Sequence, residues 1–392
     1  MRQQMREYLD APHDRFGTSC EKWDGLERHF GRPDLIAMWV ADMDFRTVPE
    51  VRDALIRRAE HAIYGYTDDG VRAREAEAGW LRRRHGLEVK TDWILYSPGV
   101  VDSIFYCVDA LTEPGDAIVI QPPVYGPFYD AVRLFGRKLV PSPLVRVDGE
   151  WRMDFDSLEA GFAAGAKLMI LCNPHNPVGR VWTRQELQRL VDLAARFDVI
   201  IVSDEIHADF AFDGRGTTRI LSLEGAGRCV MLTSATKSFN LAGLRQSSIL
   251  APDAGLREKL RGHLARVHAM SPNIFGEIAQ TAAYEQGDEW MDAVVEYVAE
   301  NRDFAVDFLR RELPEIGCQP QEGTYLMWLD FSRLGIGHED IMAMLVEKAR
   351  VAMTGGLFFG EEGRGWFRLN LATQRANVAL ALNNIRDAIR SR

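Results

Sequence analysis

The sequence has few cysteines and no long apolar run, and these two absences narrow the class of protein. The 392 residues include five widely spaced cysteines and no Cys-x-x-Cys pair; these are Cys20, Cys107, Cys172, Cys229 and Cys318. An odd and scattered set predicts reduced thiols rather than a disulfide framework, and hence a cytoplasmic protein. Because no apolar run approaches the roughly 20 residues that a membrane-spanning helix needs, we expect no membrane partner.

An excess of positive charge is missing as well. The formal net charge is -10, which argues against a nucleic-acid partner, because phosphates require a basic face. The hydrophobic share of 46% and the charged share of 27% are those of an ordinary globular protein. Since 392 residues exceed the length at which one hydrophobic core stops growing, the sequence predicts more than one domain.

Short apolar segments alternate with longer segments of helical spacing through the middle of the chain. Strands are expected over 93–96, 117–120, 167–172, 199–202 and 229–232, and a helix over 186–197. This alternation predicts an α/β fold with a mostly parallel, seven-stranded sheet between helices. Ligands in such folds collect at the carboxyl ends of the strands.

The remaining segments suggest a division into three parts. Residues 1–45 are irregular and are expected to form an arm that packs on a small domain and on a partner subunit. Residues 46–285 form the predicted large α/β domain, and residues 286–392 a smaller α+β domain. The last third of the sequence begins with a long helical region, 277–311, and contains a final helix from Gln374.

Lys237 is the most informative residue of the chain. It follows a predicted strand and three hydroxyl residues, and a glycine-containing segment leads from it to Arg245. A lysine is unusual at a buried strand end unless its amine forms a covalent bond. Two other strand ends carry Asn176 and Asp204. An amine, a carboxylate and an amide on separate strand ends are the groups that hold pyridoxal phosphate (PLP), so PLP is the predicted cofactor.

Each polar residue near Lys237 has an expected role in that site. Lys237 would bind the cofactor aldehyde, while Ser234 and Arg245 would face the phosphate. Asp204 would pair with the pyridine nitrogen, since a carboxylate favours the protonated ring; the alternative is a cap of the following segment. His207 is expected either to bond a cofactor oxygen or to be structural.

The other cofactor contacts come from three loops. Asn176, held between prolines, can donate to the phenolic oxygen of the cofactor, or can simply form a turn. Tyr125 is the best placed ring to stack on the pyridine. Gly99, Val100 and Val101 open a helix whose free N–H groups would hold phosphate.

Arg368 stands in a predicted strand of the second domain, flanked by Phe367 and Leu369. An arginine that points inward from an alternating strand needs an anion, and a substrate α-carboxylate fits a bidentate guanidinium. A structural ion pair is the alternative.

These motifs resemble a known family. Over nearly its whole length the chain resembles the fold-type I PLP enzymes of the class I/II aminotransferase superfamily. The resemblance rests on Asp204-Glu205, Arg368 and the runs Asn173-Pro-His-Asn-Pro-Val-Gly179 and Ser234-Ala-Thr-Lys237 with Arg245. Within the superfamily the chain is similar to the MalY/PatB group of cystathionine β-lyases and cysteine-S-conjugate lyases. That similarity rests on the segments 35–45, 64–67, 203–207 and 237–244.

The resemblance implies features that the residue chemistry does not give. It implies a homodimer with active sites at the interface, in which Tyr64, or alternatively Tyr66, reaches the partner's cofactor phosphate. It makes Lys237, Asp204 and Tyr125 the catalytic residues. Arg368, Asn176 and the backbone near Val40 and Ala41 would bind substrate. Gly126 departs from the family pattern of a second aromatic residue after the stacking tyrosine, and is expected to open the pocket to a thioether bulkier than cystathionine.

The predicted activity is β-elimination from L-cystathionine or another S-substituted L-cysteine, which yields a thiol, pyruvate and ammonia. One alternative is an aminotransferase, which shares the lysine, aspartate and arginine. Another is a relative specialised for a bulky cysteine S-conjugate in a biosynthetic pathway, through β-elimination or decarboxylative oxidation. A purely regulatory protein is disfavoured, because the set of catalytic groups is complete.

Overall fold

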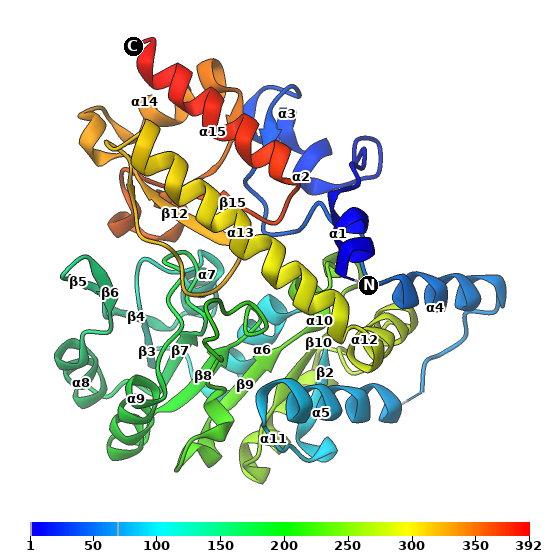
Figure 1. Ribbon diagram of the computed structural model, residues 1–392. Helices are drawn as coiled ribbons and strands as arrows, with labels where there is room; N and C mark the ends of the chain where they lie inside the picture. The colour runs from blue at the N-terminus through cyan, green and yellow to red at the C-terminus, as the bar shows by residue number, and fades with distance from the viewer. Residues whose placement is uncertain (1, 69) are drawn as a thin grey trace.

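The computed structural model describes residues 2–68 and 70–392 (Figure 1). The α-helices are α1 (Arg2–Asp10), α2 (Glu21–Asp24), α3 (Leu26–Phe30), α4 (Pro49–Glu60), α5 (Val71–His85), α6 (Val100–Leu111), α7 (Pro127–Leu134), α8 (Phe155–Ala163), α9 (Arg184–Arg196), α10 (Ala235–Ser238), α11 (Ala254–Arg266), α12 (Ile274–Gln286), α13 (Asp288–Glu312), α14 (His338–Ala343) and α15 (Arg375–Arg390). The strands are β1 (Ile36–Ala37), β2 (Ile94–Ser97), β3 (Ala117–Ile120), β4 (Lys138–Pro141), β5 (Val145–Val147), β6 (Glu150–Arg152), β7 (Leu168–Cys172), β8 (Ile200–Asp204), β9 (Val230–Thr233), β10 (Ser247–Leu250), β11 (Gly317–Cys318), β12 (Leu326–Asp330), β13 (Val351–Ala352), β14 (Thr354–Gly355) and β15 (Trp366–Asn370).

A seven-stranded sheet organises the larger part of the chain. Its strand order is β2-β10-β9-β8-β7-β3-β4, and all neighbouring pairs are parallel except those that β10 makes. The predicted α/β fold with a mostly parallel sheet of seven strands is confirmed. The five predicted strands are β2, β3, β7, β8 and β9, each displaced by no more than a residue or two at its ends.

Helices cover both faces of this sheet because successive side chains of a buried strand point in opposite directions. In β7, Met169 and Leu171 pack with residues of α8 and α9, whereas Leu168 and Ile170 pack with residues of α6, α7 and α11. All five residues of β7 are buried. A continuous apolar run of this kind is typical of a parallel strand between two helical layers.

A second, antiparallel sheet lies above the first in the view of Figure 1, with order β11-β12-β15-β14. Helices α13 and α15 pack with it in one apolar cluster. The short strand β1, from the first forty residues, pairs in parallel with β13. The division of the chain at residues 45 and 285 stays a prediction.

The predicted helical region 277–311 is helical, and it consists of two helices, α12 and α13. The chain breaks at Gly287, between α12 and α13. A β-carbon at Gly287 would clash with the ring of Phe239 and lie 2.5 Å from the Ala283 oxygen. The close approach of Phe239 therefore requires glycine where the second helix starts.

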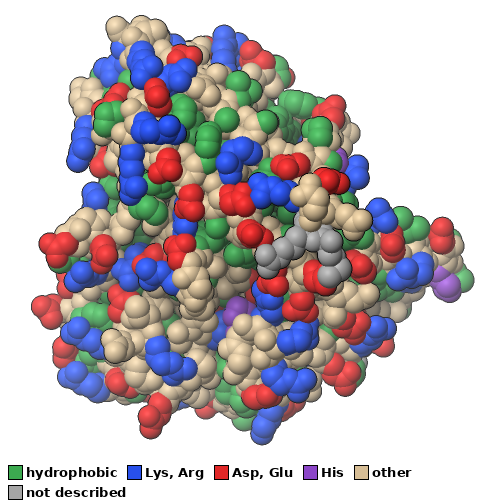
Figure 2. Space-filling view, in the orientation of Figure 1, with side chains coloured by type: hydrophobic (Ala, Val, Ile, Leu, Met, Phe, Trp, Pro, Cys, Tyr) green, Lys and Arg blue, Asp and Glu red, His purple; other side chains and the backbone are tan. Residues whose placement is uncertain are grey.

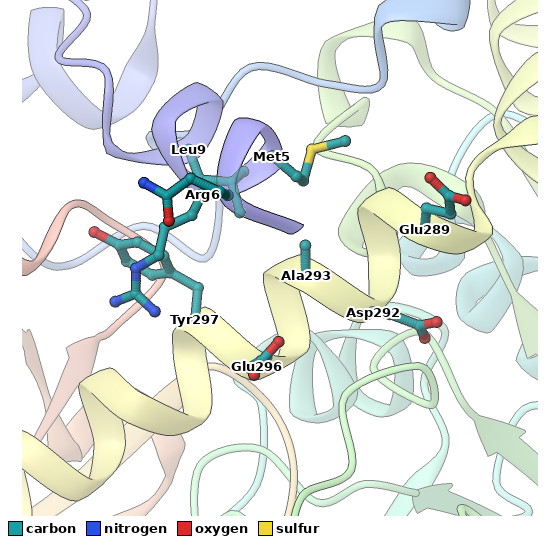
Figure 3. Close-up of a pocket in the computed structure, with 9 residues that line it drawn as sticks. Met5, Arg6, Leu9, Glu289, Asp292, Ala293, Glu296 and Tyr297 are labelled. Carbon is teal, nitrogen blue, oxygen red and sulfur yellow. The ribbon is translucent and has the colours of Figure 1, made fainter. Parts of the chain in front are cut away.

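The first helix lies along α13. Figure 3 shows Met5 and Leu9 of α1 facing Ala293 and Tyr297 of α13. They flank a groove of about 320 Å³ whose other side carries the carboxylates of α13. On the face drawn in Figure 2, basic and acidic side chains alternate over the surface. No helix in the described part of the chain has the length and apolarity to cross a membrane.

Candidate active site

A cavity of about 490 Å³ lies at the carboxyl ends of β7, β8 and β9, below the second sheet. Loops that follow separate strands meet here, as expected of an open parallel sheet. Twelve of the predicted site residues line this cavity: Val40, Ala41, Gly99, Val100, Val101, Tyr125, Asn176, Asp204, His207, Lys237, Arg245 and Arg368.

Lys237 lies in the single turn α10, directly after β9. Its Nζ donates to the backbone oxygen of Ala41 at 2.6 Å. Burial lowers the pKa of the amine, and the nearby Arg368 guanidinium lowers it further, against the opposing effect of Asp42 and Asp204. A buried amine with a lowered pKa is a good general base and a good nucleophile.

Asp204 is the last residue of β8 and is buried. Its Oδ1 accepts the backbone N–H of Ile206 at 3.1 Å. Burial raises the pKa of the carboxyl to about 7, and Glu205 adds to this shift, while the Ile206 N–H and Lys237 oppose it. A cationic N–H group placed against Asp204 would restore the ionised form.

His207 and Tyr325 close one side of the site. Their rings meet edge to face at 5.5 Å. Burial, with Lys237 and Arg368 nearby, lowers the pKa of His207 to about 3, so the imidazole is neutral. Its Nδ1 is buried without a hydrogen-bond partner among the described residues. The Tyr325 hydroxyl donates to the Ala41 oxygen at 2.9 Å, the same oxygen that accepts from Lys237.

Arg368 reaches the cavity from β15 of the second sheet. Its Nη1 donates to Asn176 Oδ1 at 3.0 Å, and its Nη2 donates to the Trp39 oxygen at 2.9 Å. No carboxylate among the described residues pairs with it, and its buried Nε makes no hydrogen bond. Burial lowers the pKa of this guanidinium to about 10. A buried cation held only by neutral groups is suited to an incoming anion.

The opposite end of the cavity is the start of α6. Gly99 precedes the helix, so the N–H groups of Val100 and Val101 belong to its first turn, where intrahelical partners are absent. Arg245 pairs with Asp102 of the same turn at 3.0 Å. Main-chain donors beside an arginine form a site for a phosphate group.

The residues present fit PLP. An unpartnered imidazole nitrogen, a buried carboxyl that lacks a cation, an amine with a lowered pKa and a helix N-terminus all face one cavity. Tyr125 adds a half-buried aromatic ring. These are the groups that the aldehyde, ring nitrogen and phosphate of this cofactor require.

Comparison with known proteins agrees with this geometry. Residues 33–385 match the family model described as aminotransferase class I and II. The chain belongs to the aminotransferase class I and II family. It is 39% identical to cystathionine beta-lyase PatB of Bacillus subtilis, over 97% of this chain and 99% of that protein. It is 34% identical to protein MalY of Escherichia coli, over 96% and 97% of the two chains.

A solved relative extends the similarity to three dimensions. Cystalysin from Treponema denticola, whose crystal structure contains a pyridoxal 5'-phosphate cofactor, is 30% identical to this chain. It superposes with a TM-score of 0.94 over 98% of both chains. The predicted resemblance to the class I/II superfamily and its MalY/PatB group is therefore confirmed.

Three predicted residues of this family member lie outside the cavity-lining set. Ser234 caps α10 and donates its hydroxyl to the Gln246 oxygen at 2.6 Å, while the neighbouring Thr236 lines the cavity. Tyr64 and Tyr66 are exposed, and the Tyr64 hydroxyl donates to Ala59 of its own chain. The roles of Ser234, Tyr64 and Tyr66 at a phosphate stay predictions.

Gly126 does not open the pocket, contrary to the expectation from sequence. A β-carbon at Gly126 would lie 2.9 Å from the oxygen of Phe358 and 3.1 Å from its ring. Phe358, from a 3₁₀ turn at 356–359, therefore occupies the space that the small residue leaves. Sequence reasoning missed this residue because it lies 232 positions away in the chain.

Other cavity residues were also missed: His29, Trp39, Thr236, Phe358 and Thr354. Trp39 is part of the segment 35–45 that carried the family resemblance, so a signal existed for it. Thr354 stands at the edge of a two-residue strand, β14, whose position beside Arg368 arises from sheet pairing.

Proposed function

We propose that this chain is a PLP-dependent carbon–sulfur lyase that cleaves L-cystathionine or another S-substituted L-cysteine. The observation that carries the proposal is the meeting of Lys237, Asp204 and Arg368 in one cavity. The names of the relatives PatB and cystalysin, and their similarity over nearly full length, support it. The net reaction adds one water: R–S–CH₂–CH(NH₃⁺)–COO⁻ and H₂O give R–SH, pyruvate and ammonium.

The roles of the side chains follow from their positions. Arg368 and Asn176 hold the substrate carboxylate, because the guanidinium is buried without a carboxylate of its own. Lys237 removes the proton from the α-carbon, because burial lowers the pKa of its amine. PLP, when bound, supplies the electron sink that makes this proton acidic. Asp204 favours the protonated form of the cofactor ring. Departure of the thiolate from the β-carbon completes the elimination.

The experiment that tests this function is product analysis. Purified protein with PLP is incubated with L-cystathionine and with S-methyl-L-cysteine, and pyruvate and thiol are measured together. Equal amounts of the two products are expected, with none from a Lys237→Ala variant. Bound cofactor with neither product would refute the proposal.

Amino transfer is the second candidate, since the matching family model carries the description aminotransferase. The two reactions share Lys237, Asp204 and Arg368 and differ in where the proton returns. Amino transfer would convert bound PLP to pyridoxamine phosphate and would release a keto acid that retains its sulfur. Detection of those two products with no free thiol would favour it.

We further propose that the active form is a homodimer. The far end of α4 and the segment after it extend from the body of the molecule (Figure 1). Ile56, Ile63, Tyr64 and Tyr66 are exposed on this extension. Exposed apolar side chains grouped on a projecting segment favour a protein partner, and a second copy is the simplest one. A mass of about twice that of the 44.3 kDa chain in light scattering is expected.

The cytoplasm is the proposed location. All five cysteines are free, and three of them are buried. Free thiols throughout a chain are typical of a reducing compartment.

A further inference from the structure

Aromatic side chains line part of the cavity. Trp39, Tyr125 and Phe358 line it from three separate segments of the chain. Tyr125 and Phe358 meet edge to face at 5.8 Å. Tyr125 is expected to stack on the cofactor, whereas the rings of Trp39 and Phe358 have no role in holding the cofactor or the amino-acid end, so these two rings are available to the S-substituent.

The turn that carries Phe358 is held firmly. The oxygen of the next residue, Phe359, accepts from the Val124 N–H and from the Tyr129 hydroxyl, both at 2.9 Å. Phe359 itself is buried beneath the Arg368 guanidinium, which lies 5.0 Å from its ring. Phe358, by contrast, is 47% exposed. A fixed backbone thus presents one ring to the cavity.

Trp39 is fixed from the other side. Its Nε1 donates to the Lys22 oxygen at 2.9 Å, and the ring of Phe30 packs against it edge to face at 5.2 Å. The His29 ring lies 4.6 Å from it. The Nε2 of His29 is 2.7 Å from Glu21, so this imidazole already has an anionic partner.

The charged residues among the described cavity lining already have other roles. Arg245 pairs with Asp102, and Lys237, Asp204 and Arg368 surround the amino-acid and cofactor positions. A carboxylate on the S-substituent would therefore meet aromatic rings in place of a cation. Desolvating such a charge without a partner is costly.

We propose that the preferred leaving groups are uncharged apolar thiolates, alkyl or aryl, whose carbon chains contact Phe358 and Trp39. The inference rests on the proposed lyase function and specifies its substrate class. It makes Phe358 a specificity-determining residue and predicts that L-cystathionine, whose distal end carries a carboxylate, is cleaved less efficiently than an S-alkyl- or S-aryl-L-cysteine.

Binding tests the inference without turnover, because analogues that lack the α-amino group cannot react. The matched pair is 3-(isopentylthio)propanoate and 3,3′-thiodipropanoate, which differ in an apolar branch or a carboxylate at one end. Calorimetry with the PLP-loaded protein is expected to show at least about ten-fold tighter binding of the isopentyl compound. Equal or tighter binding of the dicarboxylate would overturn the inference and leave the proposed lyase function standing.

Turnover adds two variants that act on the same ring. Phe358→Ala removes it, and Gly126→Ala pushes it aside, although the backbone at Gly126 is right-handed and tolerates alanine. Both are expected to lower the ratio of kcat/KM for S-benzyl-L-cysteine to that for S-methyl-L-cysteine by about ten-fold. Leu380→Ala, at an exposed position of α15, is the control and should leave the ratio unchanged.

An unchanged ratio in both variants would overturn the role of Phe358. Absence of thiol from every substrate, with the calorimetric preference intact, would instead refute the lyase function and preserve the preference for an apolar S-substituent.

Discussion

The contribution of Asp204 to the stability of the protein depends on whether a cation pairs with its carboxylate. Without a cation beside it, burial raises its pKa from 3.8 to about 7. A raised carboxyl pKa means that the folded protein holds a proton that the unfolded chain loses above pH 4. Stability of the cofactor-free protein therefore falls as pH rises from about 4 to about 7, by about 4 kcal/mol at most.

Cofactor-free Asp204→Asn is thus expected to melt at a higher temperature than cofactor-free wild type at pH 8. The difference should shrink towards pH 4, where both side chains are neutral. Asp148→Asn, at an exposed loop position, is the control. Thermal unfolding at several pH values measures the effect, and a difference independent of pH would contradict it. With PLP added the order should reverse, because Asp204 then faces a cation.

Arg368 is expected to be intolerant even of lysine. Its two Nη atoms donate in different directions, to Asn176 and to the Trp39 oxygen. A lysine ammonium lacks this planar arrangement. Arg368→Lys should lower kcat/KM for S-methyl-L-cysteine about 100-fold, while the exposed Arg364→Lys should leave it within about two-fold. Steady-state kinetics of both variants gives the comparison, and equal values for the two would argue against a carboxylate clamp.

The residues around Lys237 could be predicted from the sequence, because polar groups of the kinds that bind PLP stand at the ends of predicted strands. Lys237 and Asn176 follow strands, and Asp204 ends one. Glu205 could not be assigned in the same way. It forms a buried ion pair with Arg219 at 2.7 Å, and nothing near Arg219 in the sequence marks it as that partner. Pairings between distant buried groups depend on the folded backbone.

At the scale of elements, Gly287 separates two helices that a periodic pattern joins. Any side chain there would clash with Phe239, two residues after Lys237. Gly287→Ala is therefore expected to destabilise the protein by about 1–3 kcal/mol, as overpacking does. Gly262→Ala, within α11, meets no atom within 4 Å and should be neutral or stabilising, because alanine is the better helix former. Urea unfolding of both variants decides the matter; equal effects would contradict the clash.

The turn α10 is held from behind by a buried carboxylate. Asp209 accepts from the Ser238 hydroxyl, from His85 at 2.8 Å and from Trp80 at 3.2 Å. Although burial opposes ionisation, these donors hold the pKa of Asp209 at about 2. Ser238→Ala leaves one carboxylate oxygen unsatisfied beside Lys237.

The expected loss is about 1–3 kcal/mol in the free energy of unfolding, the usual cost of an unsatisfied buried acceptor. Ser391→Ala, at the exposed end of the chain, is the matched control. Denaturant unfolding at pH 7 measures both. A Ser238→Ala variant as stable as the control would mean that the bond to Asp209 contributes nothing.

Strand and helix positions were predictable wherever apolar residues repeat regularly, as in β7 and α9. Strand β10, Ser247–Leu250, was not predicted, because two of its four residues are serines and the apolar pattern of a buried strand is therefore missing. Its antiparallel pairing with β2 and β9 brings Arg245 to the cavity. The sequence motif around Lys237 thus predicted that Arg245 lies in the site, while the pairing of β10, which could not be predicted, places it there.

At the scale of the whole molecule, the prediction left to test concerns the second copy. Tyr64 is exposed and touches Arg58 and Phe275 of its own chain, away from the cavity. If it serves the partner's site, the Lys237→Ala and Tyr64→Ala defects of a mixed dimer both fall in the same active site. One site of that dimer then carries the intact Lys237 of one chain and the intact Tyr64 of the other.

Random exchange of the two inactive variants in equal amounts makes half of the dimers mixed, each with one complete site. Activity should therefore recover to about a quarter of the wild-type value, measured as pyruvate release after unfolding and refolding together. A tyrosine that acts within its own chain cannot give this recovery, because every site would then lack one of the two groups. Tyr66→Ala mixed with Lys237→Ala is the control: if that variant is active alone, Tyr64 is the residue that crosses the interface.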